Sequence, residues 1–235
     1  MKNKKNYFIC IIGLDGSGKS TLAIRLIEKL NGKNLNTKYV WGGYKLILLW
    51  PIIELGKKVF LKDKDMFQDF TDYNEAVKKS GSNPTISFLY QNLTLIEYYF
   101  QMLIKIKLHL VMGKTVVSDR YLYDTLVSLA ITLNYGDEKF MKMLEDISKY
   151  FPKPDLVFYI NVPAEVAFER KDDIPSIDYL KYRLRYYELI NDLITSRTND
   201  PWYKSSEVEF AKGDDLVFRR IRSNGKEDPR TNVKS

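Results

Sequence analysis

Apolar residues along this chain form two kinds of pattern, short continuous runs and longer stretches with helical spacing. Short runs are typical of buried parallel strands, and apolar residues three and four positions apart are typical of helices that cover a sheet. The runs lie at 7–12, 37–41, 115–118, 156–162 and 208–211, and the helical stretches at 19–30, 87–112, 123–133, 164–170 and 177–196. Because the two kinds alternate, we expect an α/β fold, a three-layer sandwich with helices on both faces of a parallel sheet.

One apolar run, residues 46–53, does not fit this alternation. It holds seven apolar residues and Pro51, whereas a helix that spans a bilayer needs about 20 residues. We therefore expect no transmembrane segment here, and interpret the run as a core-packing helix interrupted at Pro51. Two alternatives stay open: a dimer or membrane-surface face, with which the nearby Lys45, Lys57 and Lys58 are compatible, and a wall for an apolar substrate.

Length and composition indicate a globular protein. The 235 residues are 45% hydrophobic and 29% charged, and that length suits one α/β domain. We assign residues 1–222 to this domain and interpret the polar residues 223–235 as a disordered tail. Cys10 is the only cysteine, so no intrachain disulfide can form, and we expect a reducing, cytoplasmic setting.

The net charge of +7 would suit nucleic acid, an anionic membrane surface or nucleotide polyphosphates. The sequence shows no zinc-ligand spacing and no aromatic–glycine ribonucleoprotein box. We therefore expect small-molecule nucleotides rather than nucleic acid as partners.

Residues 13–20 (GLDGSGKS) carry the strongest functional signal. They fit the pattern G-x-x-x-x-G-K followed by Ser or Thr, placed between an expected strand and an expected helix. Glycines let backbone N–H groups curl around phosphate oxygens, and the helix N-terminus favours an anion. Lys19 would bind the β- and γ-phosphates of ATP, and Ser20 would ligate Mg²⁺. The expected ATP-binding residues of the loop are Gly13, Asp15, Gly16, Ser17, Gly18, Lys19, Ser20 and Thr21.

A second candidate group follows the run 115–118. Asp119 and Arg120 stand at the carboxyl end of an expected strand, where ligands bind in open α/β sheets. The carboxylate can hold Mg²⁺ through water and the guanidinium can neutralise an oxyanion, although such a pair could instead be a structural salt bridge. Arg170 and Lys171, after an expected short helix, could fold over a transferred phosphoryl group as a lid near residues 170–175.

With these residues assembled, the chain resembles the thymidylate kinase family of nucleoside monophosphate kinases. The resemblance rests on GLDGSGKST at 13–21, on Asp119-Arg120-Tyr121 as the family's D-R-Y box, on PDLVFYINVPAEVAFER at 154–170, and on DYLKYRLRYYEL at 178–189. It implies the fold of a P-loop nucleotide kinase, with ATP and Mg²⁺ as cofactors.

The resemblance also implies roles for single residues. Lys19 and the loop amides would bind the ATP phosphates, and Ser20 with Asp119 would hold Mg²⁺. Asp15 would contact the acceptor sugar hydroxyl, Arg120 would bind the acceptor phosphate, and Tyr121 would also lie at the acceptor site. Gly16 stands where one subgroup of the family has arginine, so Arg170 or Lys171 would stabilise the transferring charge instead. The expected catalytic residues are therefore Lys19, Asp119, Arg120 and Arg170.

Several positions depart from the family pattern. Tyr39 and Tyr98 stand in place of two arginines that bind the acceptor phosphate, and we expect these tyrosines at the acceptor site. The aromatic residue that stacks on thymine falls on Thr94, for which Tyr90 or Phe100 could substitute. The lid is also several residues shorter than usual.

The leading hypothesis is an ATP-dependent phosphoryl transfer to a nucleoside monophosphate, and the reaction that we favour converts dTMP to dTDP. One alternative is a kinase of the same fold with a nucleoside, sugar or lipid-linked alcohol as acceptor. Another is a nucleotide-binding regulatory protein without transferase activity. The sequence leaves open the acceptor, the adenine contacts and the oligomeric state, a homodimer included.

Overall fold

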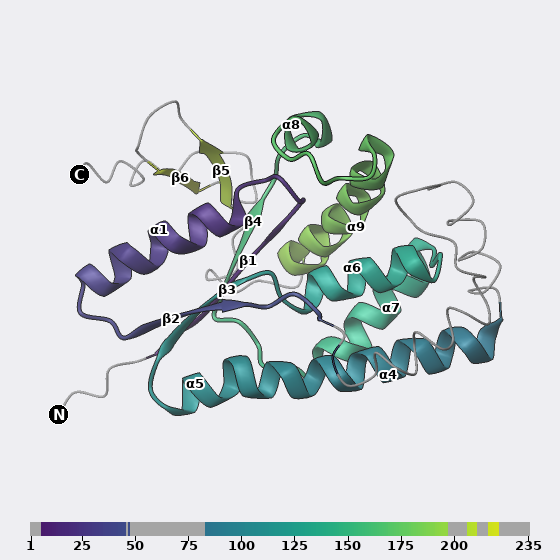
Figure 1. The fold of residues 1–235 in the computed structure, drawn as a ribbon, viewed down its shortest axis with the longest axis horizontal. Coiled ribbons are helices and arrows are strands. Elements are labelled where there is room, and N and C mark those ends of the chain that lie inside the picture. The colour runs from purple at the N-terminus through teal and green to yellow at the C-terminus, as the bar shows by residue number, and fades with distance from the viewer. Residues whose placement is uncertain (1–5, 46, 48–82, 197–205, 211–215, 221–235) are drawn as a thin grey trace.

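The computed structural model describes residues 6–45, 47, 83–196, 206–210 and 216–220 (Figure 1). Four strands form a parallel sheet in the order β2-β3-β1-β4. They are β1 (Phe8–Gly13), β2 (Thr37–Trp41), β3 (Thr115–Asp119) and β4 (Leu156–Ile160). Every residue of β1 and β3 is buried, as expected for central strands of a parallel sheet that is covered on both faces. The expected α/β class is confirmed.

Helices cover both faces of this sheet (Figure 1). α1 (Lys19–Gly32) lies on one face, and α4 (Pro84–Met102), which continues through the π-helical turn η1 (Leu103–Lys107) into α5 (Leu108–Val111), lies on the other with α6 (Leu122–Thr132). The other helices in the described ranges are α7 (Asp137–Ser148), α8 (Ala164–Glu169) and α9 (Ile177–Ser196). None of the helices in the described ranges is long and apolar enough to cross a membrane.

Three local features differ from the sequence-based expectation. The expected helix 87–112 is interrupted by the π turn of η1. Helix α7 was not predicted, although Phe140, Met143, Leu144 and Ile147 have helical spacing. The strand expected at 208–211 does not join the parallel sheet: β5 (Ser206–Phe210) pairs antiparallel with β6 (Leu216–Arg220) in a separate sheet. Its alternation of polar and apolar residues, SEVEF, is typical of such a pair.

Two sequence-based expectations lie outside the described residues. They are the core-packing helix expected at 46–53, of which only Ile47 is described, and the disordered tail expected at 223–235. The assignment of residues 1–222 to one domain stays a prediction.

Parallel pairing brings the functional segments together. β3 lies directly beside β1, with Ile11 opposite Asp119, and β4 lies on the other side of β1, with Gly13 opposite Ile160. Since parallel strands end at the same edge of the sheet, the loop after β1 and the residues after β3 are neighbours there.

Candidate active site

The loop after β1 is packed directly against helix α8. Gly16 has a φ of +84°, and a Cβ at this position would lie 2.1 Å from the carbonyl oxygen of Ala167. Only glycine fits such a close approach in this backbone conformation. The contact holds the loop against the helix that Arg170 and Lys171 follow, so both cations line the loop's cavity.

Lys19, the first residue of α1, is buried against the loop. Its side chain is 5% exposed, and its Nζ donates to the carbonyl oxygen of Gly13 at 2.8 Å and to that of Leu14. Burial and the nearby Arg120 lower the pKa of Lys19 to about 8. The ammonium is therefore held among loop backbone groups, where a phosphate would restore its full charge.

Asp119, at the carboxyl end of β3, is held by two hydroxyl groups. Its Oδ2 accepts from Ser20 Oγ at 2.5 Å and from Tyr39 OH at 3.0 Å. Burial and the Asp119 carboxylate raise the pKa of Tyr39 to about 12, so the phenol stays a donor at neutral pH. The other oxygen, Oδ1, is buried and has no hydrogen-bond partner among the described residues.

This arrangement fits a magnesium ion. A free carboxylate oxygen beside a serine hydroxyl offers the hard oxygen donors that Mg²⁺ prefers. In the described ranges no three His, Cys, Asp or Glu side chains gather as a metal cluster. Such a cluster is not required, because Mg²⁺ in phosphate-transfer sites is held by one or two protein ligands, water and the substrate phosphates.

Arg120 is aimed into the site by its backbone. It has a φ of +70°, a conformation that non-glycine residues rarely adopt and that clusters at functional sites. The backbone N–H of Arg120 donates to the carbonyl oxygen of Ile11 at 3.0 Å, and Ser118 Oγ donates to the carbonyl oxygen of Arg120 at 2.5 Å. A Cβ on Gly42, after β2, would lie 2.2 Å from that same oxygen. The chain is thus fixed on several sides of Arg120.

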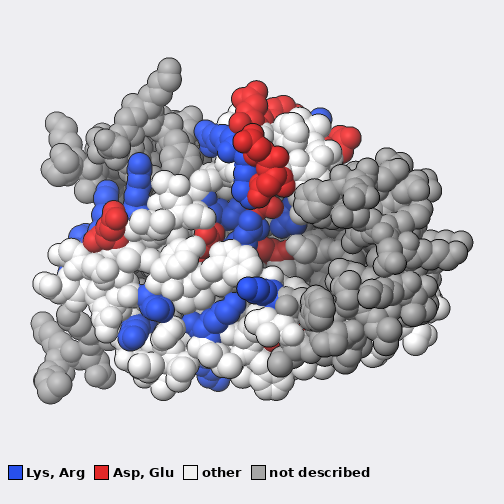
Figure 2. All heavy atoms as spheres, viewed as in Figure 1, with Lys and Arg blue, Asp and Glu red and all other residues white. Residues whose placement is uncertain are grey.

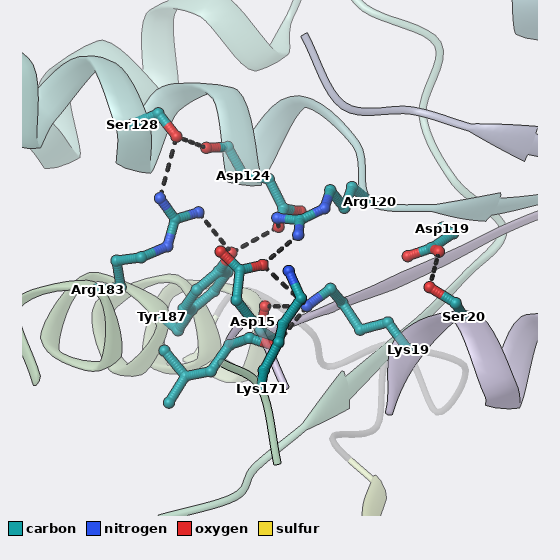
Figure 3. Close-up of polar contacts among 12 residues, drawn as sticks. Asp15, Lys19, Ser20, Asp119, Arg120, Asp124, Ser128, Lys171, Arg183 and Tyr187 are labelled. Atoms are coloured by element: carbon teal, nitrogen blue, oxygen red, sulfur yellow. Dashed lines mark hydrogen bonds and ion pairs between the residues drawn. The ribbon is translucent and has the colours of Figure 1, made fainter. Parts of the chain in front are cut away.

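The guanidinium of Arg120 pairs with two carboxylates, Asp15 in the loop and Asp124 in the first turn of α6 (Figure 3). Burial raises the pKa of Asp15, but Arg120, Arg183 and Lys19 outweigh burial and lower it to about 2. Asp15 is therefore ionised at neutral pH. The ion pairs of Arg120 are made with Asp15 and Asp124 and not with the adjacent Asp119, so Asp119 and Arg120 do not form the simple salt bridge that their sequence also allowed.

Two cavities meet at this arginine. The phosphate-loop cavity, of about 690 Å³, is lined by Asp15, Gly16, Gly18, Lys19, Ser20, Thr21, Trp41, Asp119, Arg120, Arg170 and Lys171. The second cavity, of about 260 Å³, is lined by Trp41, Gly43, Tyr44, Tyr90, Thr94, Arg120, Asp124, Thr125, Ser128, Leu129 and Thr132. Arg120 and Trp41 line both. Figure 2 shows the molecule from the same side as Figure 1, with basic side chains gathered in a hollow near the middle of the view, below a ridge of acidic side chains.

Most of the expected site residues therefore come together, but two tyrosines do not. Tyr98 is fully buried, and its hydroxyl donates to the carbonyl oxygen of Gly42 at 2.7 Å. Tyr121 is 1% exposed, packs edge-on against Phe8, and donates to the carbonyl oxygen of Pro152. Neither lines one of the two cavities. The expectation that their side chains lie at the acceptor site is wrong, because burying an aromatic ring outweighs exposing one hydroxyl that finds a partner inside.

The remaining aromatic candidates separate in the same way. Tyr90 lines the second cavity, as does Thr94, the position where the family has the aromatic residue that stacks on thymine. Phe100 is 55% exposed and lines neither cavity. Tyr39 reaches the site, but its described hydroxyl contact is with Asp119.

Sequence reasoning missed Asp124, which lines the second cavity, and two buried residues that connect to it, Tyr187 and Arg183. Tyr187 OH donates to Asp124 Oδ1 at 2.6 Å, and Arg183 is 2% exposed on α9. A signal was present, since Asp124 and Arg183 are single charges among the apolar positions of their helices. A lone charge on a helix face that packs inward is a candidate for function.

Comparisons with known proteins agree with this geometry. The family model described as thymidylate kinase matches residues 64–192. The thymidylate kinase of Thermosipho africanus is 30% identical over 222 residues, which cover 92% of this chain and 96% of that protein. That of Plasmodium falciparum is 31% identical over 169 residues, 72% of this chain and 68% of that protein. That of Leptospira interrogans is 29% identical over 183 residues, with coverage of 72% and 71%.

Proposed function

This chain belongs to the thymidylate kinase family, and from that premise we propose that it transfers the γ-phosphoryl group of ATP to dTMP. The observation that carries the proposal is the meeting of the two cavities at Arg120. A phosphoryl donor in one cavity and an acceptor phosphate in the other would place the reacting groups next to each other. Such positioning supplies much of the rate in phosphoryl transfer.

The phosphate-loop cavity is the proposed ATP site. The loop from Gly13 to Thr21, with the Lys19 ammonium, would bind the phosphates. Ser20 and Asp119 would hold Mg²⁺, which supplies charge neutralisation on the phosphate oxygens when bound. Arg170 and Lys171 line the same cavity, and we assign them to the charge of the transferring group. Lys171 also pairs with Asp173 at 2.9 Å within the short lid.

The second cavity is the proposed acceptor site. Its walls combine aromatic faces, Trp41, Tyr44 and Tyr90, with threonine and serine hydroxyls, which suits a base and a sugar. The side chains of Thr94 and Thr125 are among these lining residues. We assign both to the acceptor, because ligand pockets combine apolar walls with a few polar groups that orient the ligand.

Arg120 is the proposed ligand of the acceptor phosphate, and Asp15 its partner in the loop. The similarity to thymidylate kinases favours dTMP over a nucleoside, sugar or lipid-linked alcohol, and favours an enzyme over a regulatory protein. Small nucleotides are the partners that this function requires. A homodimer and a cytoplasmic location remain expectations from the sequence.

The test is a coupled ADP-release assay with dTMP, dUMP, dCMP, AMP and thymidine as separate acceptors. We expect dTMP to give the highest kcat/KM and the assay without acceptor to give only background hydrolysis. Lys19→Met serves as the inactive control. Highest turnover with thymidine, or hydrolysis that no acceptor stimulates, would contradict the proposal.

A further inference from the structure

Arg183 is a buried cation beside the proposed acceptor site. It lies on α9 with 2% of its surface exposed. Its guanidinium donates to Ser128 Oγ at 3.1 Å and to Tyr187 OH at 3.3 Å (Figure 3). It also donates to Tyr179 OH at 3.0 Å. Its Nε is buried without an acceptor, and the described residues place no carboxylate at ion-pair distance from it. All of its described partners are therefore uncharged hydroxyls.

A buried charge without a direct counterion is costly, so its presence calls for an explanation. Packing alone does not need a guanidinium, because an apolar side chain of similar length would fill the space without a desolvation cost. The charge of Arg183 nevertheless acts on the site, since it contributes to lowering the pKa of Asp15. The two groups therefore attract each other without touching.

Contacts connect Arg183 to Arg120 through α6. Arg183 donates to Tyr187 OH, and Tyr187 in turn donates to Asp124 Oδ1 at 2.6 Å. The same oxygen of Asp124 accepts from Arg120 at 3.4 Å. Ser128, the other α6 contact of Arg183, donates to the carbonyl oxygen of Asp124 at 2.9 Å. Arg183 thus reaches Asp124 through Tyr187 and Ser128, whereas Arg120 contacts the same carboxylate directly.

In the proposed function, Arg120 interacts with these two carboxylates and with the acceptor phosphate at the same time. In the structure its guanidinium is engaged by Asp15 and Asp124. When a phosphate dianion binds the same guanidinium, the single positive charge of Arg120 is shared among three anionic groups, and it neutralises the two carboxylates less completely. Another cation must then balance them, or the repulsion would oppose acceptor binding.

We propose that Arg183 is a positioning residue for the acceptor phosphate: its buried charge balances Asp15 and Asp124, so that Arg120 can bind the phosphate. The inference rests on the proposed function and adds a residue to it. Arginine suits this position because its planar fork donates to three hydroxyls while it keeps its charge.

The test compares Arg183→Met and Arg183→Lys with Arg185→Met. Arg185 lies on the same helix, is exposed, pairs with Asp137 at 2.6 Å and lines neither of the two cavities. For Arg183→Met we expect the KM for dTMP to rise about tenfold, with the KM for ATP within about twofold of wild type. Arg183→Lys should recover a large part of the loss, and Arg185→Met should match wild type.

Three results would overturn the inference. They are an equal rise of both KM values, a lower melting temperature with unchanged kinetics, and a lysine variant no better than the methionine variant. If Arg183→Met does not fold, Tyr187→Phe removes the hydroxyl between Arg183 and Asp124 and should raise the KM for dTMP alone; an unchanged KM would overturn the inference as well. A wild-type enzyme that does not use dTMP would contradict the proposed function instead.

Discussion

The guanidinium of Arg120 pairs with the carboxylate of Asp15, a residue 105 positions earlier in the chain. Asp15 belongs to the phosphate loop after β1, and Arg120 follows β3, the strand that lies beside β1. The pair therefore joins the proposed donor site to the proposed acceptor site through two charged side chains. A change at either residue is expected to affect both stability and acceptor binding.

The ion pair predicts a pH-dependent contribution to stability. Asp15 has a pKa of about 2 in the folded protein, below its ordinary value of 3.8. A depressed carboxyl pKa stabilises the folded state above the unfolded pKa, and this stabilisation is lost as the pH falls from about 4 toward 2. For Asp15→Asn we expect a loss of about 2 kcal/mol in the free energy of unfolding at pH 7. Urea unfolding at pH 7, 5, 4 and 3 measures it.

The difference in the free energy of unfolding between wild type and Asp15→Asn should be constant from pH 7 to pH 5 and should decrease below pH 4. Asp146→Asn is the matched control, because Asp146 forms an exposed pair with Lys149 and such pairs contribute little. An equal gap at pH 7 and pH 3 would show that Asp15 does not have a depressed pKa.

Lys19→Met is expected to lower kcat at least about 100-fold, because the ammonium stabilises charge on the transferring group. The free energy of unfolding should fall by about 1–3 kcal/mol, because methionine leaves the carbonyl oxygens of Gly13 and Leu14 without the donor that Lys19 supplies. Steady-state kinetics and urea unfolding measure the two effects. Lys29→Met, an exposed position in the last turn of α1, is the control. More than half of wild-type turnover in Lys19→Met would refute the assignment.

Tyr39→Phe is expected to raise the Mg²⁺ concentration for half-maximal activity about threefold to tenfold, as losses around a metal ligand do. The reason is that Tyr39 OH donates to the Asp119 oxygen that Ser20 also contacts, and so holds the carboxylate in place. The KM for dTMP should remain within about twofold. A magnesium titration at saturating ATP and dTMP provides the measurement.

Asp119→Asn should show a larger effect of the same kind, and Tyr182→Phe, an exposed tyrosine on α9, should show none. A Tyr39→Phe variant with altered dTMP binding and an unchanged magnesium requirement would instead place Tyr39 at the acceptor, as its sequence position suggested.

Tyr98 offers a test of the core beneath the site. Tyr98→Phe leaves the buried carbonyl of Gly42 without its donor, and should cost about 1–3 kcal/mol of unfolding free energy. Tyr98→Arg should cost about 3–5 kcal/mol, because it buries an unpaired charge. Tyr99→Phe is the control, since the ring of Tyr99 makes its contacts with Phe100 and Phe151. Tighter dTMP binding in a stable Tyr98→Arg variant would contradict the buried placement.

The sequence by itself determined the α/β class, four of the strands and the phosphate loop. These features depend on neighbours in the chain: continuous apolar runs favour buried strands, and the glycines with Lys19 and Ser20 define a loop at a strand–helix junction. It also placed Asp119 and Arg120 at a strand end. Since parallel strands end at one edge, their proximity to the loop followed, and the structure brings Ser20 and Asp119 together.

Only the tertiary structure decided which partner each polar side chain has. A tyrosine can lie at a site or in the core, and Tyr98 is buried because α4 turns it toward Gly42, whereas Tyr39 on β2 reaches Asp119. Arg183 is a single charge among the apolar positions of its helix, but only the packing of α9 against α6 places it beside Ser128 and Tyr187. Such contacts join segments far apart in the chain, and local patterns do not encode the orientation of one segment on another.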